Sequence, residues 1–118
     1  MREIKFRAWH LDDGMLYFDF DSFAKDYHNQ YENIMQYIGL KDPLGKEIYE
    51  GDIVSGGSRV MIVKFEQQAC QFWLTWKDNE GINRYEPLTA TFGDDKGYMC
   101  NHGICVIGNI YENPELLK

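Results

Sequence analysis

Turn signals recur about every eight to twelve residues along this 118-residue chain, and that spacing restricts it to short strands. The clearest turns are Asp12-Asp13-Gly14, Asp42-Pro43-Leu44-Gly45, Glu50-Gly51-Asp52 and Asp78-Asn79-Glu80-Gly81. Aspartate accepts hydrogen bonds from backbone amides, proline presets φ, and glycine tolerates positive φ, so each residue type favours chain reversal. Between the turns, apolar and polar residues alternate. The sequence therefore predicts a mainly β fold.

The expected elements follow from that alternation. We expect strands over residues 3–9, 15–20, 34–40, 59–66, 69–76 and 82–88, and a further strand that opens at Ile53. Residues 89–92 are expected to extend the 82–88 strand, and segments 98–100 and 104–111 to flank a turn at Asn101-His102-Gly103. Residues 21–33 and 93–97 are expected to be loops, the first with at most a short regular element. Asn113-Pro114-Glu115 predicts a single helical turn near the C-terminal end.

Two local patterns carry more detailed expectations. In the first strand, Ile4, Phe6 and Ala8 alternate with Glu3, Lys5 and Arg7, which predicts a half-buried strand with its charged face in solvent. At the Glu50-Gly51-Asp52 corner, Gly51 is expected to adopt a conformation that a β-carbon would forbid, and Asp52 to accept hydrogen bonds from backbone amides.

The predicted architecture is a small SH3-like barrel with an appended N-terminal β-hairpin lobe. We treat the chain as a single domain, with the lobe at about residues 1–46 and the barrel at about 47–118. Aromatic residues make up 15% of the chain, namely eight Tyr, seven Phe and three Trp. A small core cannot easily enclose so many rings, so we expect some of them to form a homo-oligomeric contact.

Charge and segment composition limit the partners and the compartment. The formal net charge is −7, from 12 basic and 19 acidic residues, which argues against unassisted binding of nucleic acid. The closest basic grouping is Arg2, Lys5 and Arg7. The charged N-terminus is unlike a signal peptide, and the longest aliphatic run, Val60 to Val63, is too short to span a membrane. We therefore expect a protein of the cytoplasm, where its three cysteines would stay reduced.

Several residue groups are candidates for chemistry, each with a plainer structural interpretation. Cys100, His102 and Cys105, with Cys70 as a fourth ligand, could hold zinc, but they lack the Cys-x-x-Cys spacing and are more often strand and turn residues. A Cys–His nucleophile pair from the same cluster would lack an orienting third group.

Carboxylates spaced two apart and a set of aromatic residues are the remaining candidates. Asp19 with Asp21, and Glu50 with Asp52, could act as acid and base or bind a cation, but such pairs are usually solvated strand ends. An aromatic groove for an extended peptide would draw on Trp73, Trp76, Tyr85, Tyr98 and Tyr111. The chain contains no phosphate-cradling glycine loop, no Gly-x-Ser-x-Gly and no His-Glu-x-x-His. We therefore predict no enzyme activity, no catalytic residues, no metal and no cofactor.

Three separated segments carry a family resemblance: Ile4 to Trp9, Gln36 to Val54 and Val106 to Leu117. Together they cover about a third of the chain, and they resemble the YopX-like family of phage and prophage proteins. The strongest part is Gly39-Leu40-Lys41-Asp42 followed by Gly45 to Val54, while Pro43-Leu44 departs from the more polar pair usual at that turn. The resemblance implies a mainly β fold with an SH3-like barrel, a phage or prophage origin and a tendency to self-associate. It implies no activity and no ligand-binding residues.

Two functions from different classes follow as hypotheses. The first is a non-enzymatic, homo-oligomeric protein-interaction module in the bacterial host cytoplasm, with a host or phage protein as a further partner. The alternative is a nucleic-acid-associated accessory factor in phage replication or expression, which the net charge makes weaker. A small hydrolase or metalloprotein is the third and most distant hypothesis.

Overall fold

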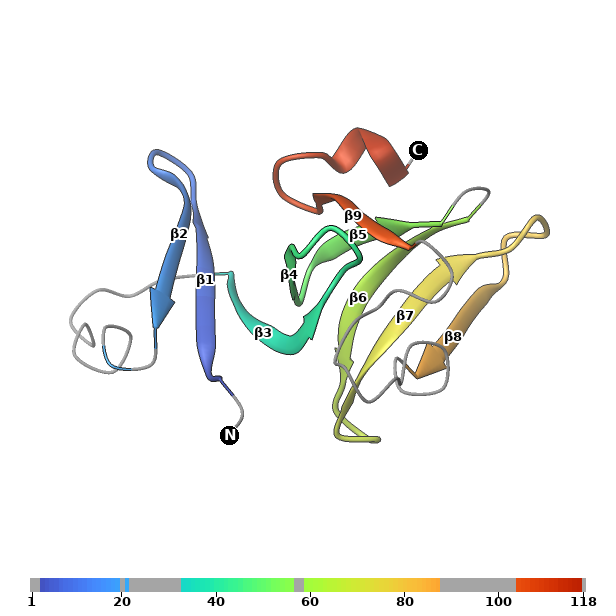
Figure 1. Ribbon diagram of the computed structural model, residues 1–118. Helices are drawn as coiled ribbons and strands as arrows, with labels where there is room; N and C mark the ends of the chain where they lie inside the picture. Colours follow the sequence, from blue (N-terminus) through green and yellow to red (C-terminus); the bar gives the residue numbers. More distant parts are fainter. Residues whose placement is uncertain (1–2, 20, 22–32, 57–58, 88–103, 118) are drawn as a thin grey trace.

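The computed structural model describes residues 3–19, 21, 33–56, 59–87 and 104–117 (Figure 1). Most of the expected loop 21–33, the expected segments 89–92, 93–97 and 98–100, and the expected turn at 101–103 lie outside these ranges.

The N-terminal part forms a four-stranded antiparallel sheet in the order β2-β1-β3-β4. Its strands are β1 (Lys5–His10), β2 (Gly14–Asp19), β3 (Ile34–Lys41) and β4 (Glu47–Tyr49). Strand β1 lies in the middle of this sheet, because Phe6 is opposite Phe18 of β2 on one side and Gln36 of β3 on the other. Figure 1 shows the β1–β2 hairpin extending away from the rest of the molecule.

The second sheet has five antiparallel strands in the order β8-β7-β6-β5-β9. These strands are β5 (Asp52–Ser55), β6 (Val60–Glu66), β7 (Gln71–Lys77), β8 (Asn83–Pro87) and β9 (Cys105–Asn109). The sheet curls on itself, and the chain then ends in a short 3₁₀ helix, η1 (Pro114–Leu117) (Figure 1). Strand β9, the last of the described strands, pairs with β5 from the middle of the sequence. The mainly β prediction is confirmed, and the curled sheet beside a second sheet is consistent with the predicted small barrel.

The hydrophobic core brings β3 and β4 together with strands of the five-stranded sheet. Its buried members are Ile38, Ile48, Val54, Met61, Val63, Leu74 and Ile104. Met61 and Val63 alternate with Ile62 and Lys64 along β6, so the strand presents one face to the core and the other away from it.

Most expected elements are present, but several ends differ: β1 begins at Lys5 rather than at residue 3, and β9 covers only Cys105–Asn109 of the expected 104–111. Strand β7 begins at Gln71 rather than at residue 69, because residues 67–70 form a turn in which the Cys70 amide donates to the Gln67 carbonyl at 3.3 Å. Cys70 has a φ of 53°, which breaks the strand conformation at that residue. The single helical turn predicted at the C-terminal end is confirmed as η1.

The expected solvent-facing charge on β1 is wrong at Arg7. This side chain is only 3% exposed, and its guanidinium donates to Asp52 Oδ1 at 2.7 Å. Alternation alone predicts exposure, but β1 is a central strand and the opposite charge comes from β5, far along the sequence. Lys5, on the same face, is paired with Glu3 and Glu47. Both described members of the expected basic group, Lys5 and Arg7, are therefore paired with carboxylates.

The corner between β4 and β5 confirms the expectation for Gly51. Its φ is +87°, and a β-carbon there would lie 2.8 Å from the Met35 sulfur. The Tyr49 amide donates to Asp52 Oδ2 at 2.8 Å, so Asp52 also accepts the backbone hydrogen bond expected of it. The predicted boundary between lobe and barrel falls at about residue 46, between β3 and β4. These two strands pair with each other, and the division of the chain at that residue stays a prediction.

Across the described part of the chain, no helix has both the length and the apolar character needed to cross a membrane.

Candidate binding groove

The face of the five-stranded sheet that points away from the core is organised in rows of facing side chains. Ile62 of β6 is opposite Thr75 of β7, and Thr75 is opposite Tyr85 of β8. Two residues along β6, Lys64 is opposite Trp73 in the next row. Side chains two apart on a strand point to the same side, so these rows form one continuous outer face.

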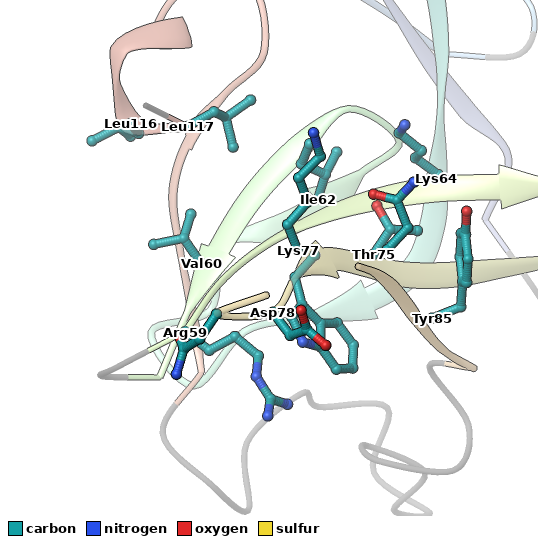
Figure 2. Close-up of a pocket in the computed structure, with 13 residues that line it drawn as sticks. Arg59, Val60, Ile62, Lys64, Thr75, Lys77, Asp78, Tyr85, Leu116 and Leu117 are labelled. Atoms are coloured by element: carbon teal, nitrogen blue, oxygen red, sulfur yellow. The ribbon is translucent and has the colours of Figure 1, made fainter. Parts of the chain in front are cut away.

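A groove of about 770 Å³ lies between this outer face and η1. Figure 2 shows Val60, Ile62, Lys64, Thr75, Lys77 and Tyr85 on the same side of the sheet as Leu116 and Leu117. Val60, Tyr85 and Leu117 are 37%, 54% and 43% exposed. The groove therefore has a partly apolar floor that solvent still reaches. We call it the outer groove.

The outer groove carries positive charge at Lys64 and Lys77. Neither Lys64 nor Lys77 forms an ion pair with any residue in the described ranges. Asp78, at the rim, is already engaged by Arg84 at 2.9 Å. The hydrogen bond from the Ile82 amide, at 2.9 Å, is the largest of the contacts that lower the pKa of Asp78. The Asp78 carboxylate is therefore ionised and already paired with Arg84.

The predicted aromatic groove is only partly assembled. Trp73 and Tyr85 meet on the outer face, with ring centroids 5.7 Å apart in an edge-on arrangement. Trp76 lies on the opposite face, where it packs against the core, and Arg59 stacks over its ring at 4.2 Å. Tyr111 stacks on Trp9, at 6.0 Å, and Tyr98 lies outside the described residues. Residues three apart on a strand face opposite sides, which separates Trp73 from Trp76.

The zinc hypothesis rests mainly on residues whose structure is not described. Cys100 and His102 lie outside the described ranges, Cys105 is half-buried in β9, and Cys70 is exposed in the 67–70 turn. Within the described ranges there is no group of three histidine, cysteine, aspartate or glutamate side chains placed to hold a metal ion. The cysteine and histidine cluster therefore stays a hypothesis.

All four residues of the two carboxylate pairs lie in the described ranges. Glu50 and Asp52 are each tied to backbone: Glu50 Oε1 accepts from the Gln36 amide at 3.4 Å, and Asp52 is held by Arg7 and the Tyr49 amide. Asp19 and Asp21 are exposed at the end of β2. Their plainer, structural interpretation is the one that these contacts favour.

A buried electrostatic cluster of Arg7, Tyr49 and Asp52 joins the two sheets. Burial raises the pKa of Asp52, and the Arg7 charge opposes that rise. The Arg7 guanidinium also lies over the Tyr49 ring, 4.8 Å from its centroid. Burial raises the pKa of Tyr49 to about 12. These groups are positioned to hold the sheets together rather than to contact a ligand.

We expect Tyr49→Phe to weaken the alkaline sensitivity of folding. The folded-state pKa of Tyr49 lies above the ordinary value of 10.0, so folding favours the protonated phenol. That contribution is complete below pH 10 and is lost as the pH rises toward about 12. Unfolding midpoints in urea, measured from pH 8 to about 11, should fall less steeply for Tyr49→Phe than for the wild type. Tyr85→Phe, at an exposed ring, is the matched control, and an equal slope in both variants would contradict the prediction.

Sequence reasoning missed both the buried pair and the charge of the groove. The Arg7–Asp52 pair joins residues 45 apart, so no local pattern announces it. The sequence does contain a signal for the groove lysines. Lys64 lies two residues from Ile62 on β6, and Lys77 lies two residues from Thr75 on β7, so each lysine shares a face with that neighbour. Recognising that signal required knowing that β6 and β7 pair in this register.

One comparison with known proteins shows the family, and another shows a similar fold. The family model described as YopX protein matches residues 15–118. A crystal structure of protein EF1440 from Enterococcus faecalis is similar, with a TM-score of 0.51 and 25% sequence identity over 100% of both chains. No curated protein matches the chain.

Proposed function

This chain belongs to the YopX family, and we propose that it is a non-enzymatic, homo-oligomeric protein-interaction module. We place it in the cytoplasm of a bacterial host, encoded by a phage or prophage, with an SH3-like barrel as its binding scaffold. A host or phage protein is a further partner in this proposal.

The observation that carries the proposal is the outer groove. It is open, it is lined by apolar and hydroxyl side chains, and it holds two lysines without an ion pair to the described residues. Protein interfaces combine an apolar centre with a charged rim in this way, and the charges select the partner. The only carboxylate among the described lining residues, Asp78, is occupied by Arg84, which favours binding over acid–base chemistry.

Reversing the groove charge should weaken self-association. We expect Lys64→Glu/Lys77→Glu to raise the self-dissociation constant by about tenfold or more, because the groove would then present negative charge to a second copy of an acidic chain. The matched control is Lys41→Glu/Lys46→Glu, which changes the net charge equally at exposed positions on the β3–β4 turn. Sedimentation velocity over a concentration series measures both. Equal weakening in the two variants would mean that net charge, not the groove, controls association.

The alternative function is favoured by one specific feature of the same groove. Tyr85 is 54% exposed and lines the same groove as Lys64, and an exposed ring in a groove that also holds a cation can stack a base of a single-stranded nucleic acid. The net charge of −7 opposes this. Gel-shift titration of a single-stranded oligonucleotide at low salt separates the alternatives, since absence of binding there would remove the nucleic-acid function.

A further inference from the structure

The turn that joins β1 to β2 exposes an unusual combination of side chains. Leu11 is 88% exposed, the highest exposure of any large apolar side chain in the described ranges, and Asp12 and Asp13 beside it are also exposed. We call residues 10–14 the hairpin tip. It presents an apolar side chain together with two carboxylates and no lysine or arginine.

The hairpin tip is held in one conformation by its own histidine. His10 Nδ1 accepts hydrogen bonds from the backbone amides of Asp12 at 3.3 Å and Asp13 at 3.2 Å. Gly14 completes the turn with a φ of +81°. A turn that is fixed before binding loses little conformational entropy on binding, which suits a docking element.

The turn between β3 and β4 also exposes a leucine, but positive rather than negative charge lies beside it. Leu44, in the β3–β4 turn, is 83% exposed, but its charged neighbours are Lys41 and Lys46, and Asp42 is only 1% exposed. Of these two tips, only the β1–β2 tip complements a positively charged groove.

The outer groove matches the hairpin tip in both charge and apolar character. Lys64 and Lys77 lie on either side of the Ile62–Thr75 row, about 13 Å apart along the sheet at the ordinary rise of a strand. Their flexible four-carbon stems allow both ammonium groups to reach toward a ligand seated on that row. Ile62 lies in the row between them, and Ile62 and Val60 supply an apolar floor.

We propose that the outer groove of one copy binds the hairpin tip of a second copy, with Leu11 on the Val60–Ile62 floor and Asp12 and Asp13 facing Lys64 and Lys77. This inference rests on the proposed homo-oligomeric function and names its interface. The hairpin tip and the β6–β7–β8 region lie on opposite sides of the molecule (Figure 1). The contact is therefore heterologous, so it builds a ring if the rotation closes and a filament if it does not.

A mixing experiment tests this pairing. The tip variant is Leu11→Ser/Asp12→Asn/Asp13→Asn, and the groove variant is Lys64→Glu/Lys77→Glu. Each alone should raise the self-dissociation constant by about tenfold or more. Mixed in equal amounts, they should form a 1:1 complex that grows no further, because only the intact groove of the tip variant and the intact tip of the groove variant can pair. Sedimentation equilibrium measures the mass, and circular dichroism checks that both variants are folded.

The possible results distinguish a wrong interface from a wrong function. Leu44→Ser, at the other exposed tip, should associate as the wild type does. If the groove variant dissociates while the tip variant associates normally, the groove takes another part of the partner, and the pairing proposed here is wrong although the proposed function stands. If neither variant changes association, both the groove function and the pairing are wrong. If the wild type does not self-associate but binds a single-stranded oligonucleotide through the groove lysines, the nucleic-acid alternative replaces both.

Discussion

Replacing Arg7 with methionine is expected to lower the free energy of unfolding by about 3–5 kcal/mol, the usual cost of leaving one partner of a buried ion pair alone. The Arg7 and Asp52 side chains are 3% and 2% exposed, and their atoms are 2.7 Å apart. Arg7 also donates to the Glu50 carbonyl at 3.3 Å, so its loss removes a second contact between β1 and the β4–β5 corner. Urea denaturation measures the change.

Two further variants show whether the loss comes from the pair. Arg59→Met removes an exposed arginine that stacks on Trp76, and it should cost much less. Arg7→Met/Asp52→Asn should cost clearly less than the sum of its single changes, since the uncompensated charge is gone. The deficit of Arg7→Met should also shrink as the pH is lowered. Without Arg7, burial raises the pKa of Asp52 further, so the folded state gains a proton before the unfolded state does. A loss below about 1 kcal/mol would contradict the buried-pair account.

Asp42→Ala is expected to cost about 2–4 kcal/mol, because one buried carboxylate serves three backbone amides. Oδ1 accepts from the amides of Leu44 at 3.0 Å and Lys46 at 2.9 Å, which closes the β3–β4 turn. Oδ2 accepts from the Val106 amide of β9 at 3.0 Å, 64 residues away. The side chain therefore stabilises a local turn and a contact between distant strands at once.

Asp42→Asn divides these two roles. An asparagine keeps an oxygen for the turn amides but places an NH₂ group toward Val106, so we expect about half of the loss seen for alanine. Hydrogen exchange at the Val106 amide should speed up in both variants, while Glu80→Ala, at the exposed turn between β7 and β8, should change neither stability nor exchange. Unchanged protection at Val106 in Asp42→Ala would show that this carboxylate does not hold β9.

What the sequence predicts well here is local. The turn at Asp42 to Gly45, the positive φ of Gly51 and the helical turn after Asn113 each follow from residues within a few positions of one another. The strands follow from alternation for the same reason. Even so, Asn113 does more than begin η1, since its side-chain oxygen accepts from the Asn109 amide at 3.2 Å. A β-carbon at Gly108 would lie 2.6 Å from that oxygen, so the last strand and the final turn are fitted to each other.

What the sequence does not predict is which distant elements meet. Arg7 finds Asp52, and Asp42 finds Val106, only once β1 lies beside β3 and β9 beside β5. These contacts join the three segments that carry the family resemblance. The groove is equally non-local, because its two lysines come from different strands and its wall from η1.

The central claim is that this chain associates with itself through the outer groove, and the mass of the wild-type protein in solution tests it most directly. Sedimentation equilibrium across a micromolar concentration range should give a mass that rises with concentration above the 13.9 kDa of the single chain. A mass of 13.9 kDa at every concentration would contradict the account.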